Sequence, residues 1–157
     1  MTDTVSTQTR SRMMSAVRNR DTQPELLVRR NLHKAGIRYR LHDRNLPGRP
    51  DLVLPKYRAV FFINGCFWHG HDCPRFSWPK TREAFWINKI LGNKNRDTRN
   101  HMELRSAGWR VAVVWGCALK GKGSLGIDAV STECIRWLNS SEPTLSIVGP
   151  GAEIVCK

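Results

Sequence analysis

The sequence predicts a single domain of mixed α/β fold, and two observations support that prediction. Helical periodicity alternates along the chain with short apolar runs, which is typical of a sheet covered by helices. The length of 157 residues suits one domain, because it is enough to bury a sizeable core and too short for two ordinary ones. The expected element order is helix, three strands, helix, strand and helix.

The first expected element is a helix that begins after Thr22. Thr22 can cap the first turn, and Glu25 three residues later completes the pattern of a capping box. Val28 and Leu32 follow at helical spacing and therefore lie on one face. Gly36 ends the helix, because glycine readily adopts the backbone conformation that terminates helices.

Three strands are expected next. Residues 37–41 alternate between apolar and polar side chains, which indicates a strand with one buried face. Residues 46–50, Leu-Pro-Gly-Arg-Pro, form a turn. Residues 51–54 and 59–63 are short apolar runs separated by four residues, so we expect adjacent strands, the second buried on both faces.

The second half of the chain predicts two helices and one strand. Residues 81–107 form a long helical stretch, interrupted near Gly92, and nine Lys or Arg residues lie between positions 75 and 110 against three acidic ones. Residues 109–115 are a buried strand, and residues 127–138 are the last helix.

The composition indicates a folded and strongly basic protein. Lys and Arg total 26 against 13 Asp and Glu, a formal net charge of +13, and six Trp and five Phe are too many for a disordered basic tail. Such a charge favours a polyanionic partner, and nucleic acid is the first candidate. A membrane surface is not favoured, because the sequence shows no apolar run of about 20 residues and no signal-peptide pattern.

We expect three regions along the chain. Residues 1–20 are a flexible basic arm, residues 21–140 the folded domain, and residues 141–157 a loosely held tail, because neither end shows a periodic apolar pattern. The arm contains four arginines, and it is either a DNA clamp or a solvated tail.

The cysteine pattern indicates a metal site. Five cysteines are an odd number, which argues against a full disulfide framework, and the absence of a secretion signal indicates a reducing cytoplasm. Residues 66–73 contain two thiols and two imidazoles. We therefore interpret the clustered cysteines as metal ligands.

A structural zinc needs four tetrahedral Cys or His ligands, and Cys66, His71 and Cys73 supply three of them. The fourth ligand is Cys117 or His69. Cys117 is favoured because it closes a long loop, whereas the alternative leaves Cys117 as a buried apolar thiol.

Two carboxylates and one histidine are candidate catalytic groups. Hydrolysis of a phosphodiester requires a divalent metal, usually magnesium, held by carboxylates. Asp51 opens an apolar strand where an acid serves no packing purpose, although capping of the preceding turn also explains it. Glu25 is explained equally well by helix capping. His69 is either a general acid or base or a residue that packs or binds metal.

Three aromatic side chains lie in the same basic part of the sequence. Phe67 and Trp68 belong to the Cys/His loop, and Trp86 belongs to the basic helix. They either form a core or act as a wedge between base pairs. Such a wedge would select weakly paired DNA, because a mismatched step costs less to open.

Several strings of residues together resemble the very-short-patch repair (Vsr) endonucleases from about Thr9 to Leu138. The matching strings are Leu46-Pro-Gly-Arg-Pro-Asp51, Gly65-Cys-Phe-Trp-His69, His71 with Cys73, Thr81-Arg82, Phe85-Trp86, Asn93, Arg96-Asp97, Gly108-Trp-Arg110 and Val114-Trp115 with Cys117-Ala-Leu119. The first two strings are highly specific when they occur in this order.

The resemblance implies a restriction-endonuclease-like fold of the PD-(D/E)xK type, a mixed central sheet flanked by helices. It also implies a structural zinc in that single domain, bound by Cys66, His71, Cys73 and Cys117. The family's fold, a helix followed by a mixed sheet, agrees with the element order predicted from periodicity.

For catalysis the resemblance implies a magnesium ion bound by Asp51 and by the backbone carbonyl of Ile63. Glu25 then orients metal-bound water, and His69 is the catalytic histidine near the scissile phosphate. Asn64 stands where relatives often have His, and an amide can hydrogen-bond metal-bound water but cannot exchange a proton with it. Ile63 replaces a smaller polar residue, and Gly116 stands where Glu is common.

The implied activity is nicking of duplex DNA 5′ to the T of a T:G mismatch, with Phe67, Trp68 and Trp86 intercalated beside the mismatch. The implied partners are mismatched double-stranded DNA and MutL-like and MutS-like repair proteins. The protein is then a bacterial, cytoplasmic and nucleoid-associated monomer. The alternatives are an endonuclease of the same fold with another mismatch or sequence preference, and a zinc-containing DNA-binding module without nuclease activity.

Overall fold

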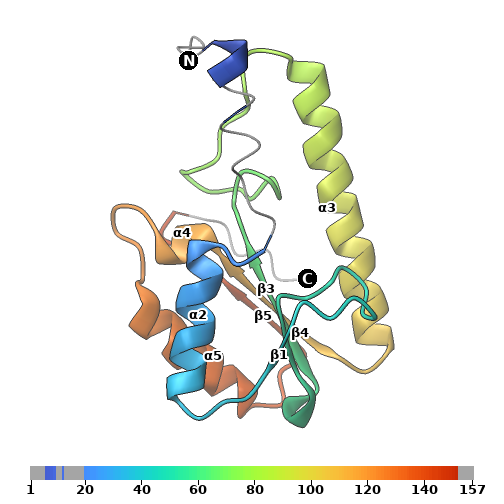
Figure 1. Cartoon of the computed structure of the whole chain (residues 1–157), viewed down its shortest axis with the longest axis vertical. Coiled ribbons are helices and arrows are strands. Elements are labelled where there is room, and N and C mark those ends of the chain that lie inside the picture. Colours follow the sequence, from blue (N-terminus) through green and yellow to red (C-terminus); the bar gives the residue numbers. More distant parts are fainter. Residues whose placement is uncertain (1–5, 10–11, 13–19, 152–157) are drawn as a thin grey trace.

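A five-stranded sheet forms the centre of the computed structural model, with helices on both of its faces (Figure 1). The structure describes residues 6–9, 12 and 20–151. Most of the predicted basic arm, residues 1–20, therefore lies outside the described residues, as does the end of the predicted tail. Within the described part, no helix is long and apolar enough to cross a membrane.

The strands lie in the sheet in their order along the chain. They are β1 (Arg40–Leu41), β2 (Leu52–Leu54), β3 (Ala59–Asn64), β4 (Arg110–Trp115) and β5 (Thr144–Ile147). β1, β2 and β3 pair antiparallel, whereas β3, β4 and β5 pair parallel. The mixed α/β architecture with helices on the sheet is thus confirmed, although β1 is shorter than the predicted strand over residues 37–41.

One face of the sheet is covered by α2 (Gln23–Lys34) and α5 (Ile127–Leu138). Val28 and Leu32 of α2 are fully buried on this face, together with Trp137 of α5. The Trp137 ring meets Phe61 of β3 edge-on, with 5.5 Å between the ring centroids. The predicted apolar stripe of α2 is therefore the surface that packs on the sheet.

The opposite face is covered by the C-terminal part of α3 (Glu83–Ser106). Leu104 is fully buried against sheet residues such as Val60 and Val113. The N-terminal half of α3 extends past the sheet (Figure 1). The interruption expected near Gly92 is wrong, because α3 is continuous through this residue.

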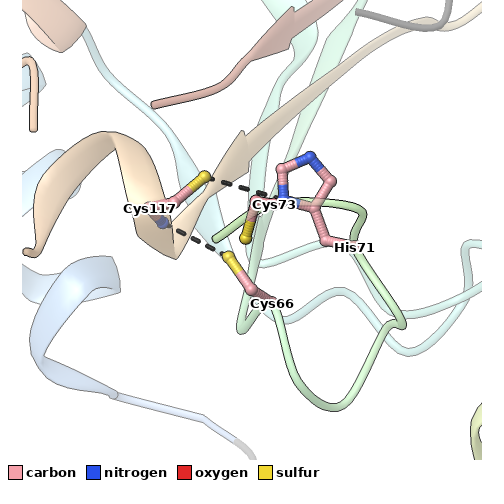
Figure 2. A group of neighbouring side chains, drawn as sticks. All are labelled: Cys66, His71, Cys73 and Cys117. Atoms are coloured by element: carbon pink, nitrogen blue, oxygen red, sulfur yellow. Dashed lines mark hydrogen bonds between the residues drawn. The ribbon is translucent and has the colours of Figure 1, made fainter. Parts of the chain in front are cut away.

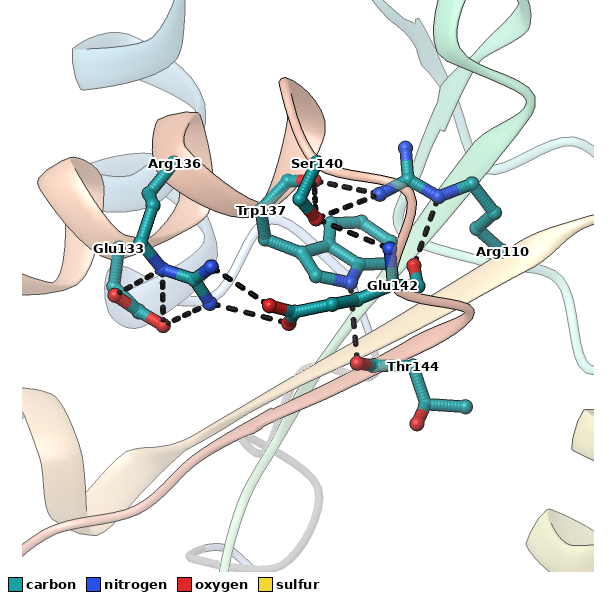
Figure 3. A network of polar contacts seen from close by, with 7 residues as sticks. All are labelled: Arg110, Glu133, Arg136, Trp137, Ser140, Glu142 and Thr144. Carbon is teal, nitrogen blue, oxygen red and sulfur yellow. Dashed lines mark hydrogen bonds and ion pairs between the residues drawn. The ribbon is translucent and has the colours of Figure 1, made fainter.

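The expectation that the chain is loosely held beyond residue 140 is wrong for the described part of this segment. β5 pairs with β4, and Ile147 is buried. Arg110 fixes the approach to β5: its guanidinium donates hydrogen bonds to the carbonyls of Trp137 at 2.6 Å and Glu142 at 3.0 Å (Figure 3). Arg136 adds ion pairs to Glu142 and Glu133 on the surface.

Candidate metal centre and active site

A group of three cysteines and one histidine lies where β3 and β4 end. Cys66, His71 and Cys73 belong to the loop after β3, and Cys117 belongs to the short helix α4 (Gly116–Leu119) after β4 (Figure 2). β3 and β4 are parallel, with Asn64 opposite Trp115, so the segments that follow the two strands leave the sheet at the same edge.

The four side chains are arranged as a candidate metal site. Their ligand atoms all lie within 4.8 Å of one another, and all four residues are buried. Burial raises the pKa of the Cys66 thiol to about 12, so the thiolate form requires a nearby cation. Three thiols and one imidazole are the donor set of a closed structural zinc site, and these residues therefore fit such an ion.

Neighbouring groups hold these ligands in place. The backbone N–H of Cys117 donates to Cys66 Sγ at 3.3 Å, and the N–H of Gly149 donates to Cys117 Sγ at 3.2 Å. The His71 ring stacks on Trp115 with 4.0 Å between centroids and 6° between planes. Amide hydrogen bonds to sulfur stabilise thiolates, and stacking fixes the orientation of the imidazole.

The two candidates for the fourth ligand lie in different places. Cys117 belongs to the cluster, and His69 does not. The Nδ1 atom of His69 is instead 2.5 Å from Asp97 Oδ2 on α3. The structure therefore leaves His69 available for a role outside the metal cluster.

A cavity of about 590 Å³ is lined by the predicted catalytic and magnesium-site residues other than Glu25. Asp51, Ile63, Asn64 and His69 all line it. Asp51 precedes β2, whereas Ile63 and Asn64 end β3 and His69 follows in the loop. The antiparallel pairing of β2 with β3 brings the start of one strand beside the end of the other. Arginines complete the lining, at positions Arg20, Arg44, Arg49 and Arg96.

Asp51 is a half-buried carboxylate at the wall of this cavity. Its Oδ2 atom accepts a hydrogen bond of 2.7 Å from the backbone N–H of Ile63. Burial, with a smaller contribution from Glu25, raises the pKa of Asp51 to about 7, against the opposing effects of the Ile63 hydrogen bond and of His42 and His69. A cation bound in the cavity would stabilise the ionised form.

Glu25 lies deeper than the cavity wall, with 1% of its surface exposed. Thr22 caps α2 by accepting a hydrogen bond from the Glu25 N–H. The Glu25 carboxylate accepts from the Asp21 N–H at 2.8 Å and pairs with Arg29 and His42. The predicted cap by Thr22 is thus confirmed, but the capping box is not complete, because the Glu25 carboxylate accepts from the Asp21 N–H rather than from the Thr22 N–H.

Sequence reasoning missed two residues of this site, His42 and Asp97. Asp97 was noted only as part of the Arg96-Asp97 string that resembles the Vsr family, and His42 belongs to none of the strings that resemble this family. Nε2 of His42 lies 2.9 Å from Glu25 Oε1, and its Nδ1 lies 3.9 Å from Asp51 Oδ1. An isolated acid on a basic helix was an available signal for Asp97, whereas no sequence pattern pointed to His42.

The three predicted stacking residues form one aromatic cluster, which we call the aromatic triad: Phe67, Trp68 and Trp86. Their ring centroids are 5.2–5.9 Å apart, and all three side chains are half-buried. The side-chain amide of Asn93 on α3 donates to the Trp68 carbonyl at 2.9 Å, which ties the loop to the helix. Trp68 and His69 also line a second cavity of about 740 Å³.

Comparison with known proteins identifies the family. The family described as "DNA mismatch endonuclease Vsr" matches residues 2–75. The chain is 43% identical over 138 residues to the DNA mismatch endonuclease Vsr of Escherichia coli K12, covering 88% of each protein. It is 49% identical over 125 residues to the type II nicking enzyme V.XorIIP of Xanthomonas oryzae pv. oryzae, covering 80% of this chain and 92% of that protein. The chain therefore belongs to the Vsr family of DNA mismatch endonucleases.

Proposed function

We propose that this protein is a DNA mismatch endonuclease that nicks duplex DNA 5′ to the T of a T:G pair and so initiates very-short-patch repair. The observation that carries the proposal is that Asp51 and His69 line the same cavity. The loop that contains His69 also contains Phe67 and Trp68 of the aromatic triad. The loop after β3 thus brings His69, a candidate hydrolytic group, and two candidate stacking rings close to Asp51.

The candidate roles follow from the chemistry of each side chain. Asp51 would bind magnesium together with the backbone carbonyl of Ile63, and the ion would supply Lewis-acid activation of water and charge stabilisation at the phosphate. Glu25 and Asn64 would orient the attacking water through hydrogen bonds. His69 would hold or transfer a proton beside the scissile phosphate.

The contact between His69 and Asp97 supports the proposed role of this histidine. A carboxylate at Nδ1 fixes the ring orientation and favours the tautomer with its proton on Nδ1. Nε2 is then the nitrogen directed at the reaction. The arginines of the cavity supply positive charge where a phosphate would lie.

The metal cluster and the aromatic triad fit a recognition role. We infer that the ion held by Cys66, His71, Cys73 and Cys117 is zinc and that it stiffens the loop containing Phe67 and Trp68. Rings held on a braced loop can open a weakly paired step at a lower cost than a well-paired one. Preference for a mismatch would then arise because unstacking a mismatched step costs less free energy than unstacking a paired one.

The element order also supports a PD-(D/E)xK-type nuclease fold, because a helix precedes a mixed sheet whose second strand begins next to an acid. We further propose that the protein acts as a monomer in the bacterial cytoplasm, with residues 21–140 as the catalytic domain and mismatched DNA as its substrate. MutL-like and MutS-like repair proteins are proposed partners of this protein.

A nicking assay tests this function. Purified protein is incubated with magnesium and end-labelled duplexes that carry a T:G pair, a U:G pair or a T:A pair at the same position. We expect faster nicking of the T:G duplex, and loss of nicking but not of binding for Asp51→Ala. Equal rates on all duplexes would indicate an endonuclease with another preference, and binding without any nicking would indicate a DNA-binding module.

A further inference from the structure

His42 lies between the two carboxylates to which the proposed function assigns metal and water binding. Its Nε2 atom is 2.9 Å from Glu25 Oε1 and 3.5 Å from Asp21 Oδ1, and its Nδ1 atom is 3.9 Å from Asp51 Oδ1. The side chain is 20% exposed and lines the same cavity as Asp51 and His69.

The backbone explains why His42 is placed there. Leu41 pairs with Leu52 in the antiparallel β1–β2 ladder, and the His42 N–H donates to the Asp51 carbonyl at 3.2 Å. His42 itself has φ of 49°, in the left-handed region that few residues other than glycine adopt. This conformation ends β1 and turns the ring toward α2, where Glu25 lies.

The geometry points to His42 as a positioning residue that holds the Glu25 carboxylate beside Asp51, an inference that rests on the proposed function. Glu25 belongs to α2 and Asp51 to the start of β2, and His42 has a ring nitrogen near each. Its Nε2 atom makes an ion-pair contact with one oxygen of Glu25 that lacks hydrogen-bond geometry. The same oxygen accepts a hydrogen bond from Arg29, while the Asp21 N–H binds the other oxygen. Glu25 is thus held from both of its oxygens.

A metal ion is a poorer explanation for this group. The ligand atoms of Asp21, Glu25 and His42 lie close enough together to suggest one. However, Arg29 Nη1 is already 2.8 Å from Asp21 Oδ1 and 3.3 Å from Glu25 Oε1. A guanidinium at these oxygens supplies the positive charge and excludes a second cation from the same position.

Two substitutions separate a positioning role from a purely structural one. His42→Gln keeps a hydrogen-bond donor near the place of Nε2, whereas His42→Asn keeps one only near the place of Nδ1. Asn adopts the left-handed backbone more readily than Gln. If only the backbone conformation mattered, Asn would be the better replacement, but if contact with Glu25 matters, Gln is better.

The measurement is single-turnover nicking of the T:G duplex, with DNA affinity determined without magnesium. We expect His42→Asn to lower the nicking rate about 10- to 100-fold, the range typical for loss of a group that orients a metal-site ligand, and His42→Gln to recover most of that loss. Affinity for DNA should remain unchanged in both. His33→Asn, on the exposed side of α2, is the matched control and should nick like the unaltered protein.

A double substitution shows whether His42 acts through Glu25. In a Glu25→Gln background, His42→Asn should cause little further loss of rate. Fully multiplicative losses, or an Asn variant at least as active as the Gln variant, would overturn the inference.

A measurement on the free protein is independent of the activity. With ¹⁵N-labelled histidine, the Nε2 resonance of His42 should shift in Glu25→Gln, and an unchanged resonance would disprove the contact. If the unaltered protein fails to nick mismatched DNA, the proposed function fails, whereas the spectrum still decides whether His42 holds Glu25.

Discussion

Asp51 is a carboxylate whose burial is unfavourable in the absence of a cation. Its pKa rises from 3.8 to about 7 in the folded protein. The folded state therefore binds more protons than the unfolded state between these values, and its stability falls as the pH rises from about 4 to about 7. This cost to stability is consistent with the proposed role of Asp51 as a metal ligand, since strongly shifted pKa values cluster at functional sites.

Asp51→Asn is therefore expected to abolish nicking and to stabilise the protein. An amide remains neutral, so the gain in free energy of unfolding should be small near pH 4, should grow up to about pH 7 and should then stay constant, at about 1.4 kcal/mol per pKa unit. Urea unfolding of both proteins without added magnesium measures this difference. A gain that does not depend on pH would contradict the assignment of the titrating group.

Asp97 is the residue that orients His69, with its carboxylate 2.5 Å from Nδ1. Asp97→Asn leaves the size of the side chain almost unchanged but replaces a charged acceptor. We expect nicking to fall about 10- to 100-fold with little change in DNA affinity. Asp128→Asn, at an exposed position of α5, is the control, and a similar loss in both variants would exclude a specific role.

At the scale of elements, the sequence predicted the helices and strands that show a local apolar pattern. It did not predict the features that depend on contacts between segments distant in sequence. α5 has the predicted bounds, and β3 is buried on both faces as its unbroken apolar run indicated. β5 was missed although its residues Thr-Leu-Ser-Ile alternate between polar and apolar, because four residues are too short a run and their partner strand lies far away in sequence. For the same reason the sequence suggested Asp51 and His69 as site residues but could not identify His42, whose partners come from α2 and β2.

Gly92 shows how a glycine can mislead a prediction. It lies at an exposed position inside α3, and a Cβ added there would meet no atom within 4 Å. Gly92→Ala should therefore raise the free energy of unfolding by about 0.5–1 kcal/mol, because alanine loses less backbone entropy in a helix. Thermal or urea unfolding tests this, and destabilisation would show that the helix needs glycine here.

Gly149, unlike Gly92, leaves no room for a side chain, because it lies close to the candidate metal centre. A Cβ at this position would lie 2.2 Å from the Cys117 carbonyl oxygen, and the Gly149 N–H donates to Cys117 Sγ. We expect Gly149→Ala to displace this amide and to weaken metal binding. Competition with a chromogenic chelator measures the change, and Gly92→Ala serves as the control that should release metal like the unaltered protein.

At the scale of the whole molecule, two different forces act on DNA. The net charge of +13 attracts any duplex through its phosphates, whereas in the proposed function the aromatic triad distinguishes duplexes by how easily they unstack. The first force depends on released counterions and the second does not. Salt concentration therefore separates them.

We expect affinity for both T:G and fully paired duplexes to fall steeply with salt, by about 10³- to 10⁵-fold between 50 and 200 mM if 6–10 phosphates are contacted. The ratio of the two affinities should stay constant over the same range, because the unstacking cost is a property of the DNA. Fluorescence anisotropy with magnesium omitted measures both. Trp68→Ala should reduce the ratio and leave the salt slope unchanged, since a ring contributes no charge; a changed slope would place recognition in the phosphate contacts instead.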